Sequence, residues 1–122
     1  MPYMLRLFRA IVTAVALLAL PLPAFATDGF ASGADLKGWC DNMELDDIHW
    51  GLCVGSITAA HDIVMTYQQA DAANEVVCTT MSTTRADVVY AVIQYMDENA
   101  HDLDYSLGDV VLSAMADKFP CD

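Results

Sequence analysis

Four cysteines in a short chain most strongly constrain what this sequence can fold into. They are Cys40, Cys53, Cys78 and Cys121 in a protein of 122 residues. An even number of cysteines in a short exported chain is typical of a disulfide framework, which supports a domain too small to bury a large core. Four cysteines allow three pairings, and the spacing alone does not choose between them.

The N-terminus has the three parts of a secretory signal peptide. Arg6 and Arg9 provide the positive start, the uncharged run IVTAVALLALPLP follows, and Ala24-Phe25-Ala26 is a small-x-small cleavage site. The apolar run is shorter than the roughly 20 residues that span a bilayer. An uncleaved anchor is the alternative, but no stop-transfer pattern follows. We expect residues 1–26 to be a signal peptide, residues 27–122 to form a single domain, and the mature protein to be periplasmic and free of the membrane.

The mature chain is strongly acidic. All 17 acidic residues follow the signal peptide, whereas only Lys37, Arg85 and Lys118 among the basic residues do. Phosphate backbones and anionic membrane surfaces would repel this charge, which argues against nucleic-acid and membrane binding. A basic protein partner would be attracted. The alternative is that the acidic residues only keep the protein soluble.

Apolar residues recur at helical spacing over most of the mature chain, without a convincing strand pattern. Three expected helices begin with a serine or threonine followed three residues later by aspartate, as in a capping box, and Asp46 or Asp47 can cap the other. The expected helices are Gly33 to about Asp41, Ile48 to about Ala70, Thr84 to about Met96, and Ser106 to about Pro120. The predicted fold class is all-α, a small disulfide-stapled bundle of about four helices.

The expected helices favour one set of disulfides. In an up-and-down bundle, Cys40–Cys53 lies near the start of the second helix, and Cys78–Cys121 joins two segments at one end. Cys53–Cys78 with Cys40–Cys121 would follow if the long loop doubles back along the second helix.

Gly51 and Gly55 lie one turn apart inside the second expected helix. A glycine inside a helix costs about 1 kcal/mol relative to alanine. We expect the close approach of another backbone to compensate for that cost.

The sequence contains no pattern that favours a catalytic or metal site. A cysteine nucleophile needs a free thiolate beside a base, but oxidation can pair every cysteine here. His49 and His61 lie about 18 Å apart along one helix, and neighbouring His61 and Asp62 are expected to point apart. No H-E-x-x-H or C-x-x-C spacing occurs, and no pair of carboxylates stands out for glycoside chemistry. We predict that the protein is not an enzyme and has no cofactor.

The C-terminal half, VCTTMSTTRADVVYAVIQYMDENAHDLDYSLGDVVLSAMADKFPC, resembles the Tai-type immunity proteins against amidase effectors of type VI secretion. The elements that carry the resemblance are Cys78, Thr84, Tyr95-Met96, the acidic connection 97–104 and Phe119-Pro120-Cys121. Upstream, Cys40 and the run Gly51-Leu52-Cys53-Val54-Gly55 are also similar. The chain departs from the family at Thr80, where members often have proline, and at Asn99-Ala100-His101, where they often have His-Pro-Glu.

The resemblance implies a periplasmic helical protein that binds and blocks a secreted peptidoglycan-cleaving amidase without catalytic residues of its own. Such an inhibitor needs a rigid projection that fills the groove of the enzyme. The segment from Asp97 to Tyr105 is the best candidate, because an aromatic anchor ringed by polar groups is typical of tight interfaces. Its candidate partner-binding residues are Asp97, Glu98, Asp102, Asp104 and Tyr105. The alternative is a solvated turn without a binding role.

Two further hypotheses remain open from the sequence. The many carboxylates would be protonated at about pH 2–3, which suits a small acid-stress chaperone of the periplasm. The few lysines argue against it, because little positive charge is left to expand the chain in acid. A homodimer is a further candidate assembly.

Overall fold

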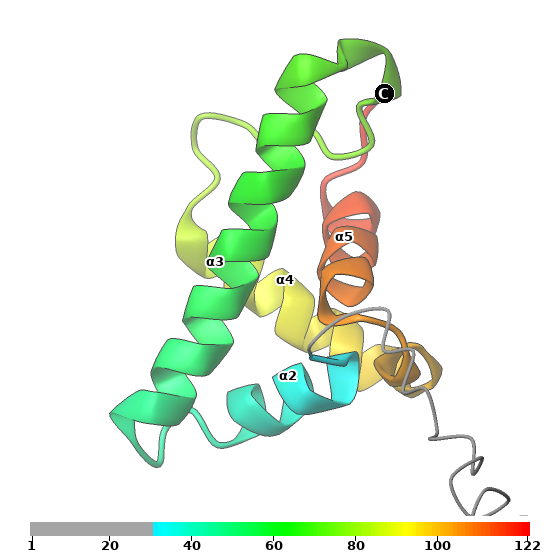
Figure 1. Ribbon diagram of the computed structural model, residues 1–122. Coiled ribbons are helices and arrows are strands. Elements are labelled where there is room, and N and C mark those ends of the chain that lie inside the picture. The colour runs from blue at the N-terminus through cyan, green and yellow to red at the C-terminus, as the bar shows by residue number, and fades with distance from the viewer. Residues whose placement is uncertain (1–30) are drawn as a thin grey trace, which may run out of the picture.

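The computed structural model describes residues 31–122, and the predicted signal peptide lies outside the described residues. The described chain forms α2 (Gly33–Asp41), α3 (Asp47–Ala70), α4 (Arg85–Glu98) and α5 (Leu107–Lys118), with short 3-10 helices η1 (Ala72–Asn74) and η2 (Ala100–Asp104) (Figure 1). Over residues 31–122 the only strand-like pairing is an isolated bridge between Ser32 and Ser106. The predicted all-α bundle of about four helices is confirmed.

Side-chain caps explain where the four helices begin. Ser32 and Thr84 both form complete capping boxes, with Asp35 and Asp87 as the respective reciprocal partners. Ser106 accepts a hydrogen bond from the backbone N–H of Asp109. Asp46, rather than Asp47, caps α3 by accepting from the backbone N–H of His49. These contacts satisfy N–H groups that have no partner within the helix.

The core lies where the four helices meet. α2 packs mainly on α3, and α4 packs mainly on α5. The largest fully buried side chains come from every helix and from the connection after η1: Leu36, Ile57, Val77, Val92, Met96, Val110, Val111 and Met115. Burying side chains of this kind contributes about 1.5–3 kcal/mol each, so the core supplies the main driving force for folding.

A buried glutamine fixes the connection between α3 and α4. Gln68 donates from Nε2 to the carbonyl of Val77 at 2.8 Å, and its Oε1 accepts from the N–H groups of Val76 and Val77 at 2.9 Å each. The side chain therefore replaces a strand partner for an extended segment. This is why an amide can be buried here without an unsatisfied polar group.

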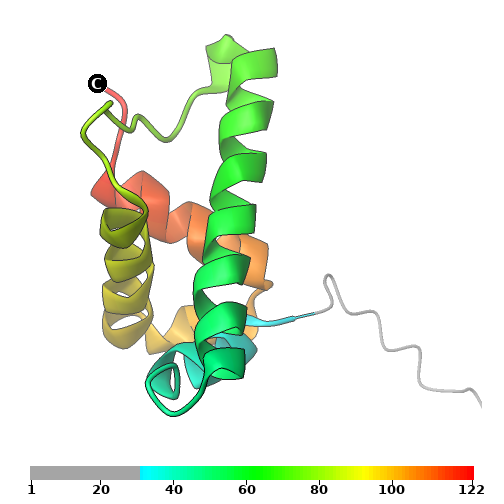
Figure 2. The same cartoon turned by 90° about the vertical axis from the view of Figure 1, so that its left-hand side faces the viewer.

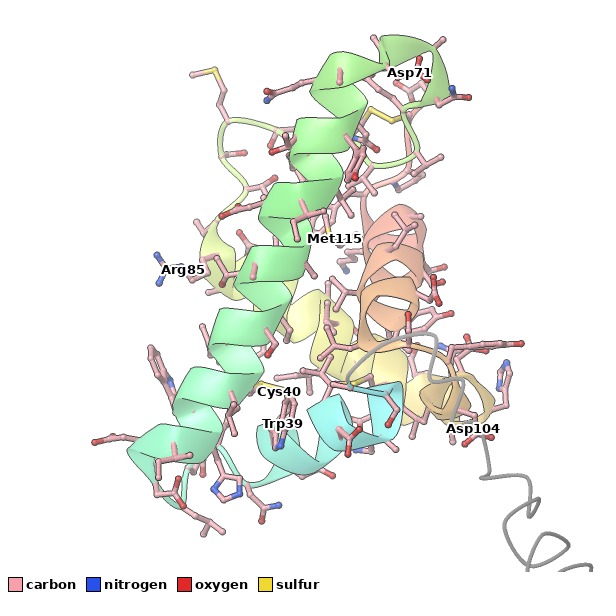
Figure 3. All side chains as sticks on the ribbon, viewed as in Figure 1. Trp39, Cys40, Asp71, Arg85, Asp104 and Met115 are labelled. Carbon is pink, nitrogen blue, oxygen red and sulfur yellow. A yellow bond between two sulfur atoms is a disulfide. The ribbon has the colours of Figure 1, made fainter. Side chains whose placement is uncertain are left out.

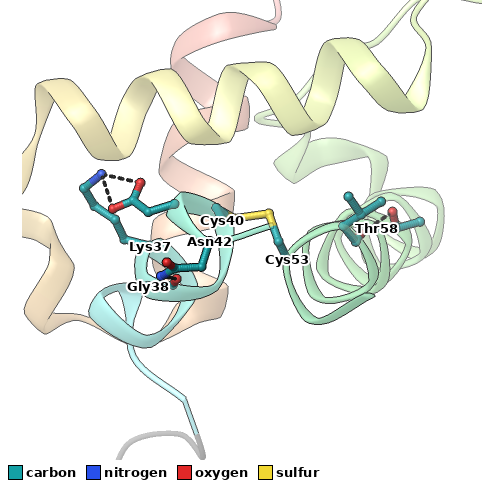
Figure 4. The surroundings of a disulfide bond; sticks show 8 residues. Lys37, Gly38, Cys40, Asn42, Cys53 and Thr58 are labelled. Atoms are coloured by element: carbon teal, nitrogen blue, oxygen red, sulfur yellow. Dashed lines mark hydrogen bonds and ion pairs between the residues drawn. A yellow bond between two sulfur atoms is a disulfide. The ribbon is translucent and has the colours of Figure 1, made fainter. Parts of the chain in front are cut away.

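The two disulfides join Cys40 to Cys53 and Cys78 to Cys121, which are the pairs that the sequence favours. The first is buried in the core and links the end of α2 to α3 (Figure 4). The second ties the 71–84 connection to the C-terminus at the far end of the bundle, where the N–H of Cys78 also donates to the carbonyl of Phe119 at 2.7 Å (Figure 2). The buried bridge fixes the core, and the outer bridge closes a loop.

The expectation that another backbone packs closely on Gly51 and Gly55 is wrong within this chain. A Cβ atom at either position would meet nothing within 4 Å in the described structure, because both glycines face outward on α3. Gly33 is the glycine that needs to lack a side chain. A Cβ there would lie 2.7 Å from Cγ2 of Val110 and 3.0 Å from Cα of Leu103.

Candidate partner-binding site

The acidic connection 97–105 is a short, ordered bridge between α4 and α5. η2 occupies its centre, and Figure 3 places Asp104 at the outer edge of the molecule, on the side opposite Arg85. The partly buried side chain of Leu103 packs against the core and anchors the middle of the segment. The connection is therefore an ordered segment, and residues 97–105 are called the projection below.

Lys37 fixes the beginning of this projection. Its Nζ donates to Oδ1 of Asp97 at 2.7 Å and to Oδ1 of Asp41 at 2.9 Å, so one ammonium group links α2 to the end of α4. The hydrogen bond to Asp97, followed by that to Asp41, raises the pKa of Lys37. The lysine thus stays charged and satisfies the carboxylate of Asp97.

Tyr95 and His101 fix the centre of the projection through Asp102. The hydroxyl of Tyr95 donates to Oδ2 of Asp102 at 2.5 Å, and Nε2 of His101 lies 3.2 Å from Oδ1. The hydrogen bond to Asp102 is the main cause of the raised pKa of Tyr95, which keeps the phenol protonated as a donor. Because both of its oxygens have a partner, Asp102 serves mainly to hold η2 against α4.

Backbone hydrogen bonds fix the end of the projection. The N–H of Gly33 donates to the carbonyl of Tyr105, and the N–H of Leu107 donates to the carbonyl of Ala31, both at 2.9 Å. The missing Cβ of Gly33 is what lets α2 approach η2 this closely. Tyr105 therefore has a fixed backbone, while its ring is 61% exposed.

The five residues predicted from the sequence divide into two groups. The side chains of Asp97 and Asp102 bond to residues of other elements or turns that hold the projection, whereas those of Glu98, Asp104 and Tyr105 make no such contact; all of the five except Asp102 are exposed. Asp104 and Tyr105 lie next to each other at the end of η2. Glu98 accepts a hydrogen bond from Gln94 on the outer face of α4 at 2.9 Å. The exposed side chains of Asp104 and Tyr105 thus form the accessible tip of the projection.

Sequence reasoning missed three contributors to this site. Lys37 and Tyr95 support the projection, and His101 presents a largely exposed side chain beside the tip. No spacing rule would have found Lys37, because its partner Asp97 lies sixty residues away. The signals that pointed to the segment were its acidic composition and the aromatic anchor Tyr105.

The groups considered for catalysis have other partners. All four cysteines are in disulfides, including Cys78 and Cys121, whose sulfurs lie near Glu75 in a potential donor cluster. Nδ1 of His49 lies 2.8 Å from Oδ2 of Asp46, at the start of α3. The expectation that His61 and Asp62 point apart is wrong, because Nδ1 of His61 lies 3.0 Å from Oδ1 of Asp62. The two side chains therefore point toward each other on the surface of α3.

The comparisons with known proteins give one match. Residues 32–121 match the model of a family described as Rap1a immunity proteins. No curated protein and no solved structure matches the chain. Among the described residues, no helix has the length and apolar character needed to cross a membrane.

Proposed function

The chain belongs to the Rap1a family of immunity proteins, and we propose that it binds a peptidoglycan-cleaving amidase effector of type VI secretion in the periplasm and blocks its active-site groove. The family match, which spans the whole described bundle from Ser32 to Cys121, is the observation that carries this proposal. It supports an immunity protein against an effector. The amidase and the compartment come from the sequence resemblance and the predicted signal peptide.

The projection 97–105 has the rigidity that an inhibitor needs. Lys37 holds its start, Tyr95 holds its centre and Gly33 holds its end, so η2 loses little conformational freedom when it enters a groove. Preorganisation of this kind increases affinity because the ordering cost is already met in the free protein. The exposed ring of Tyr105 provides the apolar anchor, and Asp104 provides a charge beside it.

The function requires no turnover by this protein. A bound projection would exclude substrate from the enzyme, and the acidic surface would speed the encounter with a basic rim around the groove. The cysteines are all in disulfides and His49 is paired with Asp46 at the start of α3, so in this proposal these groups serve the scaffold.

Affinity capture tests the proposal directly. The mature, disulfide-bonded protein should retain a cell-wall amidase from periplasmic extract and inhibit its hydrolysis of peptidoglycan. Tyr105→Ala removes the anchor and should weaken binding by about 30-fold, the loss expected for an interface hot spot of about 2 kcal/mol. Tyr67→Ala is the matched control, because Tyr67 is also an exposed tyrosine, on α3 (73%, against 61% for Tyr105).

Two outcomes would contradict the proposal. One is that no cell-wall hydrolase is retained and that cells lacking the protein stay resistant to neighbours that deliver effectors. The other is that Tyr105→Ala and Tyr67→Ala bind the amidase equally well, which would place the inhibitory surface elsewhere.

A further inference from the structure

The outer disulfide, Cys78–Cys121, has a carboxylate beside its sulfur atoms. A carboxylate oxygen of Glu75 and the two sulfurs all lie within 4.8 Å of one another. Figure 3 shows this disulfide near Asp71, at the end of the bundle opposite the one that carries Asp104. The group therefore lies outside the site proposed for the effector, and neither the core nor the projection uses it.

The backbone on both sides of Glu75 is fixed. The N–H of Asn74 donates to the carbonyl of Asp71 at 3.1 Å. Oε1 of the buried Gln68 accepts from the N–H groups of the two residues after Glu75, at 2.9 Å each. The carboxylate is thus restricted to the positions that its side chain reaches from a fixed backbone, and both sulfurs lie within that reach.

No ion pair neutralises Glu75 in the part of the chain that the structure describes. The ion pairs of residues 31–122 involve Lys37 and the three histidines, and none of them includes Glu75. Asp122, directly after the second cysteine of the disulfide, adds a further exposed carboxylate. A reagent that approaches the outer disulfide therefore meets negative charge.

The opening of a disulfide by a thiol is sensitive to charge at this place. A thiolate attacks one sulfur, and the S–S bond breaks as the new S–S bond forms. Attack on Cys78, the more exposed of the pair, gives a mixed disulfide on Cys78 and releases the thiolate of Cys121, which takes a proton from water. A second thiolate then attacks the reagent's sulfur in the mixed disulfide, so two reagent thiols are oxidised to one disulfide while both cysteines are reduced. A carboxylate beside the sulfurs disfavours an incoming negative charge.

We propose that the outer disulfide is a thiol-exchange site and that Glu75 selects the thiols that open it. Thiols with a second negative charge are slowed by repulsion from Glu75. Thiols with a positive charge next to the sulfur are favoured, because that charge can pair with the carboxylate while the sulfur lies against Sγ of Cys78. The buried Cys40–Cys53 disulfide is excluded from exchange because no thiol reaches its sulfurs. This inference does not depend on the proposed function.

A matched series of small thiols tests the proposal. Aminoethanethiol, mercaptoethanol and mercaptoethanesulfonate share a two-carbon chain and carry an ammonium, a hydroxyl or a sulfonate group. We would measure the initial rate of mixed-disulfide formation on the mature, oxidised protein by acid quench, alkylation and mass mapping, at equal thiolate concentrations. At about 10 mM salt, where charges act over about 30 Å, the rate should fall from the ammonium thiol to the sulfonate thiol.

Glu75→Gln keeps the shape of the side chain and removes its charge. The ratio of the ammonium-thiol rate to the sulfonate-thiol rate should fall by at least about fivefold, because the two thiols differ by two charges that act on the same carboxylate. At about 1 M salt, where charges act over only about 3 Å, the variant and the unsubstituted protein should have similar ratios.

Glu44→Gln is the matched control. It removes the same charge from an exposed residue of the turn between α2 and α3 and should leave the ratio unchanged. Circular dichroism melts of both oxidised variants check that the fold is kept. The use of a ratio separates charge from packing, since a loosened chain would raise the rates with all three thiols alike.

Three results would overturn the proposal. The first is a ratio that Glu75→Gln leaves unchanged, which includes an equal rise in rate with every thiol. The second is an effect of Glu44→Gln as large as that of Glu75→Gln, and the third is mixed disulfides that form first on Cys40 or Cys53.

Discussion

The hydroxyl of Tyr95 donates a hydrogen bond of 2.5 Å to Oδ2 of Asp102, and this contact joins the last turns of α4 to η2. Tyr95 itself is only partly exposed, so the ring is held by the core while its hydroxyl reaches the projection. The contact gives an acidic connection a defined shape, which the composition of the connection alone would not do.

Removing this hydroxyl should loosen the projection. Tyr95→Phe deletes a hydrogen bond to a charged group, and such bonds contribute about 1.5–3 kcal/mol. The free energy of unfolding should therefore fall by no more than about 3 kcal/mol. Urea denaturation measures the change, and amide hydrogen exchange should increase at residues 100–105. Tyr67→Phe, at an exposed tyrosine of α3, is the control. Equal stability of the two variants would show that the Tyr95 contact contributes nothing.

Alanine substitutions at glycines should have opposite effects on stability. Gly51→Ala and Gly55→Ala fill open space on α3 and should stabilise the protein by up to about 1 kcal/mol each. Gly33→Ala forces a Cβ against Val110 and Leu103, and overpacking of this kind costs about 1–3 kcal/mol. Thermal melts at one protein concentration compare the three variants. A stabilising Gly33→Ala would contradict the close approach of α2 to η2.

The two disulfides should differ in accessibility to reductant. Cys40 and Cys53 are buried, whereas Cys78 is exposed, and exposed disulfides are the more labile ones. Mild reduction followed by alkylation and mass mapping should label Cys78 and Cys121 first. By loop length alone the two bridges contribute at most about 3 and about 4 kcal/mol, respectively. Labelling of Cys40 and Cys53 before the outer pair would contradict the assigned burial.

Acid should destabilise the helix starts. Hydrogen bonds from Ser32 lower the pKa of Asp35, those from His49 lower the pKa of Asp46, and those from Thr84 lower the pKa of Asp87. A carboxyl with a lowered folded-state pKa contributes stability above its unfolded pKa of about 3.9, and that stability is lost as the pH falls through the folded value.

Substitution of a capping aspartate should therefore make the free energy of unfolding depend less on pH in acid. Asp87→Asn should reduce the loss of unfolding free energy between about pH 4 and pH 2, because asparagine does not titrate. Denaturant titrations at several pH values measure this slope. Asp117→Asn, in an exposed residue of α5 that caps no helix, is the control. If both variants keep the original slope, the capping carboxylates are not the source of acid sensitivity.

The helices could be predicted from the sequence because their signals are local. Ser32 with Asp35 and Thr84 with Asp87 specify the starts of α2 and α4 over three residues, and the structure begins both helices there. The spacing rules for capping depend on backbone geometry within one turn, so no tertiary information is needed.

The shape of the projection and the role of the glycines depend on tertiary contacts. The projection is held at its start by Lys37 and at its end by Gly33, both from α2, and no local pattern predicts that α2 reaches it. The same dependence on tertiary contacts explains why the expectation of a close backbone at Gly51 and Gly55 is wrong. Gly33 is the first residue of α2, whereas Gly51 and Gly55 lie inside α3, and of these three only Gly33 has another element of the described residues packed against it.

The most direct test of the central claim is a titration of the amidase retained from extract with the mature, oxidised protein. We expect peptidoglycan hydrolysis to fall to zero near one equivalent of binding sites, and Tyr105→Ala to raise the inhibition constant about 30-fold. Full hydrolysis at a large excess of the protein would contradict an inhibitor built on the 97–105 projection.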